Sequence, residues 1–119
     1  MKKSVLLLLL TLCCITMNAQ NDYYMRQAQS YQREAGYYTK KAQGYDREAE
    51  YYNRQAQGYL REAEYYSKRE KYDQVRNYQR RAKNATDRAE SYKRWADDAR
   101  DKARSYMRNA EDALRKAKR

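Results

Sequence analysis

The fold of this chain is decided by residues 24–66, YMRQAQSYQREAGYYTKKAQGYDREAEYYNRQAQGYLREAEYY. A seven-residue phrase, Tyr-x-Arg/Lys-x-Ala-x-x, repeats through this stretch, and each alanine stands four residues after one tyrosine and three before the next. This 4-3 spacing is the seam of a coiled coil, with alanine at heptad position a and tyrosine at d. Proline is absent and Ala, Gln, Glu, Lys and Arg are abundant, so the composition also favours helix.

A second block of the same phrase follows, out of phase with the first. Its d positions alternate tyrosine with alanine: Tyr78, Ala85, Tyr92, Ala99, Tyr106 and Ala113. Tyr66 and Tyr78 are twelve residues apart, which turns the seam by about 120° on a continuous helix, whereas one heptad turns it by only about 20°. A reversal of the chain near Ser67–Asp73 removes this mismatch. The pattern therefore predicts an all-α, antiparallel two-helix coiled-coil hairpin with Tyr/Ala heptads.

The predicted boundaries follow from the two blocks. We expect one helix over about 22–68, a turn over about 69–73 and a second helix over about 74–118, with Asp22 as the N-cap of the first. The alternative is one long self-associating helix, because the segment 67–70 contains neither Gly nor Pro. Ser67-x-x-Glu70 matches a capping box, which can begin a second helix or occur by chance inside a long one.

The hairpin also has a predicted register. In an antiparallel hairpin, the numbers of two residues that face each other in one layer have a constant sum. A sum of 141 uses both arms along their full length and places Tyr45, for example, opposite Ala96. Alanines of the first block likewise face tyrosines of the second: Ala35 faces Tyr106, Ala49 faces Tyr92 and Ala63 faces Tyr78. Because each large residue faces a small one, we expect the d tyrosines to be buried in the seam. Trp95, at position g, is expected to seal one layer or to mark a self-association patch.

The first 19 residues differ from the repeat. A basic start (Lys2, Lys3) precedes an apolar segment of residues 5–17, and Asn18-Ala19-Gln20 offers a small residue for cleavage. This is the pattern of a secretory signal peptide cleaved after Ala19, and the apolar segment is too short for a membrane anchor. We therefore expect an exported protein of residues 20–119, periplasmic or extracellular, with no membrane span once the signal is removed.

The composition of the mature chain excludes several kinds of chemistry. Both cysteines, Cys13 and Cys14, lie in the predicted signal, and the sequence contains no histidine. Disulfides, thiol nucleophiles and Cys/His metal sites are therefore excluded. The acidic residues are spread along helix faces beside basic ones, as in surface ion pairs, and do not indicate a pair of catalytic carboxylates. We predict no catalytic site, no metal site, no cofactor and no small-molecule substrate.

The mature chain is strongly basic. Lys2 and Lys3 leave with the signal, so 25 of the 27 lysines and arginines remain against 16 acidic residues, a net charge of about +9. Such a charge attracts polyanions, and it also keeps a repetitive helix soluble and apart from its copies.

Two periodic sets of residues could carry an interaction. Position f of the first arm is basic in seven successive heptads, here called the basic stripe: Arg26, Arg33, Lys40, Arg47, Arg54, Arg61 and Lys68. Tyrosines recur every fourteen residues at position c, here called the c-position tyrosines and expected to be exposed: Tyr23, Tyr37, Tyr51 and Tyr65. Arg47 is spaced to stack on the ring of Tyr51. Together the two sets match a surface for an extended polyanion, although position f is also the ordinary solvated face of a coiled coil.

Two functional hypotheses follow. The first is an exported, non-enzymatic coiled-coil protein with a structural, spacer or scaffold role at the cell envelope, able to self-associate through the Tyr/Ala seam. The alternative is a basic helical binder of a polyanion such as lipopolysaccharide, wall polymer or nucleic acid. In that case the first arm is the better candidate, because Asp87 and Asp101 interrupt the corresponding positions of the second arm.

Overall fold

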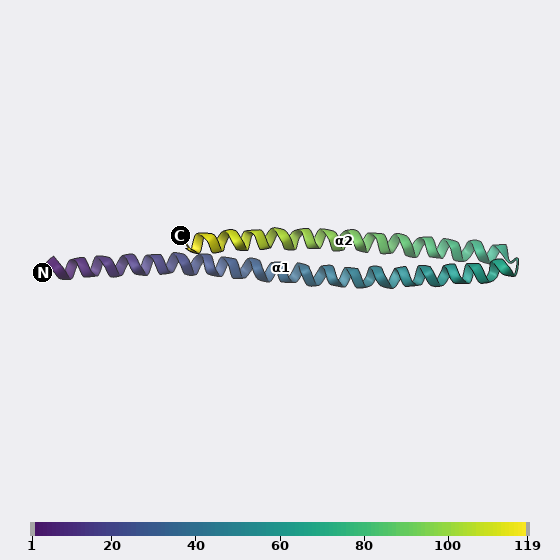
Figure 1. Ribbon diagram of the computed structural model, residues 1–119, viewed down its shortest axis with the longest axis horizontal. Helices are drawn as coiled ribbons and strands as arrows, with labels where there is room; N and C mark the ends of the chain where they lie inside the picture. Colours follow the sequence, from purple (N-terminus) through teal and green to yellow (C-terminus); the bar gives the residue numbers. More distant parts are fainter. Residues whose placement is uncertain (1, 119) are drawn as a thin grey trace. The chain divides into compact units, whose positions relative to one another are not determined.

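A computed structural model describes residues 2–118, and the side chains of residues 19–118. It contains two helices, α1 (Lys2–Lys68) and α2 (Tyr72–Lys118), and no strand over the described residues. Figure 1 shows the chain reversing its direction between them, so that α1 and α2 are antiparallel and pack against each other. The helical hairpin predicted from the two heptad blocks is confirmed, and the single long helix is wrong.

The first helix of the described chain includes the residues before the repeat. α1 begins at Lys2, so Asp22 lies inside it. The helix start near residue 22, with Asp22 as N-cap, stays a prediction for the chain without residues 1–19. Nothing in the sequence between the apolar segment and the first heptad breaks a helix, because it contains neither Gly nor Pro. The signal peptide of residues 1–19 stays a prediction.

The turn is formed by the end of α1. The Lys71 amide donates to the Tyr66 carbonyl and the Glu70 amide to the Ser67 carbonyl, both at 3.1 Å. Glu70 has a φ of 59°. These two bonds around one left-handed residue form a Schellman motif, in which Glu70 occupies the place usually taken by glycine. Ser67 therefore lies in the last turn of α1, and the capping box that its spacing suggested does not begin α2.

The contacts divide the hairpin into two compact units. One unit comprises Met1–Tyr37 with Lys102–Arg119, and the other comprises Tyr38–Asp101. In the first unit the rings of Tyr31 and Tyr106 lie 6.2 Å apart, and Lys116 Nζ lies 5.9 Å from the ring of Tyr24. The second unit contains the turn and most of the described aromatic contacts.

The core is made of alanine. Every buried side chain among the described residues is an alanine, exposed by at most 7%: Ala28, Ala35, Ala42, Ala49, Ala56, Ala63, Ala82, Ala85, Ala89, Ala96, Ala99, Ala103, Ala110 and Ala113. The tyrosines at d are half-buried, which corrects the expectation that they lie buried in the seam. Alanine layers bring two helices close together, so a phenol ring does not fit between them and covers the flank of the seam instead.

The ring contacts establish the register in the second unit. Tyr92 lies 6.1 Å from Tyr45 and 5.7 Å from Tyr52, between ring centroids. It is thus midway between two tyrosines of α1 and level with Ala49, as the sum of 141 requires. Tyr78 is midway between its two partners in the same way, 6.2 Å from Tyr59 and 5.5 Å from Tyr66.

The backbone of Glu70 leads to a stability prediction. A non-glycine residue in the left-handed region costs about 1 kcal/mol, so Glu70→Gly is expected to raise the free energy of unfolding by about that amount. Urea unfolding measures the change as a higher midpoint. Lys68→Gly, inside the last turn of α1, is the control and is expected to lower the midpoint. A lower midpoint for Glu70→Gly would show that the turn is not built on this left-handed residue.

Candidate functional site

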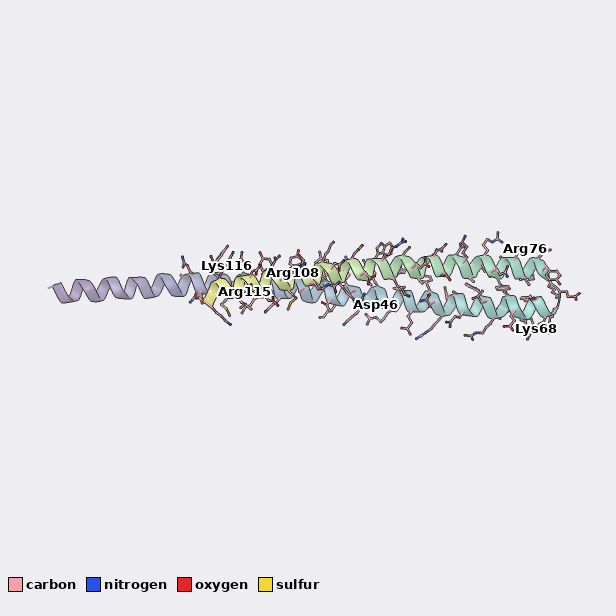
Figure 2. The ribbon with its side chains drawn as sticks, turned by 45° about the horizontal axis from the view of Figure 1, so that its top comes forward. Asp46, Lys68, Arg76, Arg108, Arg115 and Lys116 are labelled. Carbon is pink, nitrogen blue, oxygen red and sulfur yellow. The ribbon has the colours of Figure 1, made fainter. Side chains whose placement is uncertain are left out.

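The basic stripe lies along α1 with all seven side chains exposed. Arg54 pairs with Glu50 at 2.5 Å, and Lys68 pairs with Glu64 at 3.8 Å. Figure 2 shows Lys68 at the turn end of α1. The other five cations of the stripe form no ion pair with any described side chain. Most of the stripe therefore presents charge that no neighbouring carboxylate compensates.

The c-position tyrosines are exposed, by 59, 57, 53 and 46% in chain order from Tyr23 to Tyr65. Arg47 does not stack on Tyr51. Instead Gln55 Nε2 donates to Tyr51 Oη at 2.9 Å, and the Tyr51 ring packs edge-on against Tyr52, 5.2 Å away. Tyr51 contacts Tyr52 rather than Arg47 because contact with a second aromatic ring covers more apolar surface than contact with a solvated guanidinium. The basic stripe and Tyr51 are therefore separate features of the surface.

Rings of both helices contact one another along the flank of the seam in the second unit, here called the aromatic flank: Tyr45, Tyr52, Tyr59, Tyr66, Tyr78 and Tyr92. Trp95 extends it. Its ring lies 5.1 Å from Tyr92 and 5.8 Å from Tyr45, although its side chain is 49% exposed. It therefore packs against both of these tyrosines, which lie in neighbouring layers, while part of the indole stays accessible.

The aromatic flank is interrupted at a layer that the sequence analysis did not single out. In the 141 register Ala85 faces Ala56, so the layer contains no tyrosine. A hollow of about 340 Å³ opens there, here called the Ala85 hollow. The rings of Tyr52 and Tyr59 line it from α1, and polar side chains of α2 complete its rim.

Two arginines of α2 line the Ala85 hollow, Arg81 and Arg88. The guanidinium carbon of Arg88 lies 5.5 Å from the centre of the Tyr52 ring, and Nη1 donates to Tyr52 Oη at 3.3 Å. The guanidinium carbon of Arg81 lies 5.4 Å from the centre of the Tyr78 ring. Each cation is thus held against a ring, and the hollow combines aromatic walls with positive charge.

Sequence reasoning missed Arg81 and Arg88 because it looked for cations at position f, whereas both occupy position g beside the seam. The signal that could have found them is the alternation of tyrosine and alanine at d in the second block. Combined with the register, this alternation identifies the layers in which alanine faces alanine.

An ion pair between the arms lies elsewhere in the second unit. Arg100 of α2 pairs with Asp46 of α1, labelled in Figure 2, and with Asp97 of α2 at 3.0 Å. The side chains of Arg100 and Asp46 are 42% and 44% exposed, so their pairing contributes at most about 1 kcal/mol. It favours the antiparallel pairing without forming a ligand site.

The described residues contain no group of three or more Asp, Glu, His or Cys side chains placed to hold a metal ion. Over the same residues, neither helix has an apolar stretch that could cross a membrane. Comparison of the chain with protein-family models, with curated proteins and with solved structures finds no match.

The two classes of tyrosine are expected to differ in stability. Tyr92→Ala removes a ring held between two others and is expected to lower the free energy of unfolding by about 2 kcal/mol. Tyr51→Ala removes a ring that is 53% exposed and is expected to cost less than about 1 kcal/mol. Urea unfolding of both variants measures the difference. Equal losses would contradict the assignment of Tyr92 to the packed flank.

Proposed function

We propose that this chain is an exported, non-enzymatic structural protein that acts as a spacer or scaffold at the cell envelope. The observation that carries the proposal is the alanine core. Among the described residues the interior contains no polar or charged side chain, so it provides packing without a reactive group. Each added heptad lengthens such a helix by about 10 Å and leaves its outer face unchanged, which is the property that a spacer needs.

Complementation in cells tests this role. In a host deleted for the gene, we expect a defect in envelope integrity, measured as sensitivity to detergent. A variant with all seven stripe residues changed to Gln is expected to restore resistance, because the core is intact. A variant with Ala49→Asp and Ala96→Asp is expected to fail, because both charges enter the core.

The matched control for the core variant is Gln43→Asp with Gln57→Asp, which adds the same charge at exposed positions of α1. This control is expected to restore resistance. The structural role is wrong if the folded stripe variant fails to complement, since the outer charge would then be the functional feature.

The unpaired cations of the basic stripe favour polyanion binding as a second candidate function. Arg26, Arg33, Lys40, Arg47 and Arg61 lie at the same heptad position and lack a described carboxylate partner. Cations that face a polyanion release its counterions on binding, so the affinity depends steeply on salt.

Salt dependence tests this candidate. For Arg33→Gln with Arg47→Gln, the slope of log K against log salt for single-stranded DNA is expected to shrink by about 1.4, because each contact contributes about 0.7. Arg76→Gln with Arg115→Gln removes the same charge from α2 and is expected to change the slope much less. Figure 2 shows both of these control residues on α2. Equal changes for the two pairs would indicate attraction by net charge alone, without a site on the stripe.

A further inference from the structure

The Ala85 hollow is a position in a stack of rings from which one ring is missing. On one side of it, Tyr92 of α2 fills the space between Tyr45 and Tyr52 of α1. On the other side, Tyr78 of α2 fills the space between Tyr59 and Tyr66. The space between Tyr52 and Tyr59 would take a ring from position 85, where the chain has alanine.

The missing ring has known geometry, because the filled positions show it. In the filled layers the inserted phenol lies 5.5–6.2 Å from the rings on either side, nearly parallel to one of them at 9° or 10°. These are favourable separations for aromatic pairs. The hollow of about 340 Å³ is also large enough, since an engineered cavity of about 150 Å³ is known to bind benzene.

The rim of the hollow suits a phenol more than a purely apolar ring. Arg81 and Arg88 offer hydrogen-bond donors and positive charge to an inserted ring, and Asp87 offers an acceptor for the hydroxyl of an inserted phenol. A neutral phenol satisfies both kinds of group and brings no further charge next to the two arginines.

We propose that the Ala85 hollow binds one tyrosine ring of a second copy of this chain, and that Tyr51 of that copy supplies the ring. Tyr51 lies at the rim of its own hollow, because it contacts both Gln55 and Tyr52, which line that hollow. The projecting ring and the receiving hollow thus share one face. Two copies related by a twofold axis can therefore each insert Tyr51 into the other.

The periodicity of the sequence supports this pairing. The c-position tyrosines recur every fourteen residues, and so do the alanines at d of the second arm, a step of about 21 Å along a helix. In two antiparallel copies that place Tyr51 opposite Ala56, Tyr65 is level with Ala42, which in the 141 register faces Ala99. The same register thus aligns two exposed tyrosines with two all-alanine layers.

This self-association rests on the proposed structural role, since it is the step that would turn single hairpins into a scaffold. It also has a distinct dependence on salt. Each mature copy carries about +9, so the copies repel each other at low ionic strength. Raising the salt to about 1 M shortens the Debye length to about 3 Å, and association should become stronger. Binding to a polyanion changes in the opposite direction.

The test compares wild type with Ala85→Tyr by sedimentation equilibrium, on protein expressed for export and with its N-terminus determined by mass spectrometry. Ala85→Tyr fills the hollow from within, as Tyr78 and Tyr92 fill the neighbouring layers. The wild type is expected to approach the mass of a dimer as concentration and salt rise. Ala85→Tyr is expected to stay monomeric and to unfold at a higher urea concentration.

Tyr51→Ala tests the same contact from the inserting side and does not depend on how Ala85→Tyr folds. It is expected to weaken dimerisation about tenfold or more, as removal of a central aromatic contact does. Tyr72→Ala is the control, because Tyr72 is also exposed, by 59%, but lies at the start of α2 away from the hollow. This control is expected to dimerise like wild type.

Two results would overturn the proposal. The first is a wild-type chain that stays monomeric at every salt concentration, and the second is a dimer that Tyr51→Ala leaves intact. If the monomeric wild type binds p-cresol when Ala85→Tyr does not, the hollow is assigned to a small aromatic ligand instead. A monomeric wild type whose stripe variant restores resistance removes only this inference, whereas a dimeric wild type whose folded stripe variant fails to complement removes only the structural role.

Discussion

The close approach of two helices through alanine is the constraint on which the rest of this structure depends. Alanine has no atoms beyond Cβ, so an all-alanine a position lets the helices pack tightly and leaves no space for a larger side chain between them. The tyrosines at d are then displaced to the flank, where they are half-buried and contact one another. The core sets the distance between the helices, and the flank provides the large contact area that alanine lacks.

The two arms differ in the residues at position d. The first arm has tyrosine at every d position, while the second alternates tyrosine with alanine. Tyr78 and Tyr92 of α2 each fill the space between two rings of α1. Where the second arm has alanine at residue 85, the space stays open beside Arg81 and Arg88. One alanine in place of a tyrosine thus produces a surface feature that neither arm has alone. The alanines at d of the second arm recur with the same fourteen-residue period as the exposed tyrosines.

Much of the fold could be predicted from residue spacing alone. The offset between Tyr66 and Tyr78 predicts the reversal, and the use of both arms along their full length predicts the register that Tyr78 and Tyr92 confirm. The burial of the tyrosines was mispredicted because heptad position specifies direction and not the distance between the helices. The left-handed Glu70 was missed because turn formation at that point overrides the preference of the residue.

The candidate site was less predictable for a related reason. Exposure of the c-position tyrosines follows from their place on one helix, and the structure places them accordingly. A hollow depends on residues from both arms at once, so it can be found only after the register is known. The roles of Arg81 and Arg88 likewise depend on the rings of the opposite helix.

The central claim is that rings from the two arms alternate along one flank in the 141 register, and nuclear Overhauser effects between assigned tyrosine rings test it most directly. The account predicts effects from Tyr92 to both Tyr45 and Tyr52. It also predicts that no tyrosine of α2 connects Tyr52 with Tyr59. Effects from Tyr92 to Tyr52 and Tyr59 would contradict the account, because they would mean that the arms are shifted by one heptad and that Ala85 does not lie between Tyr52 and Tyr59.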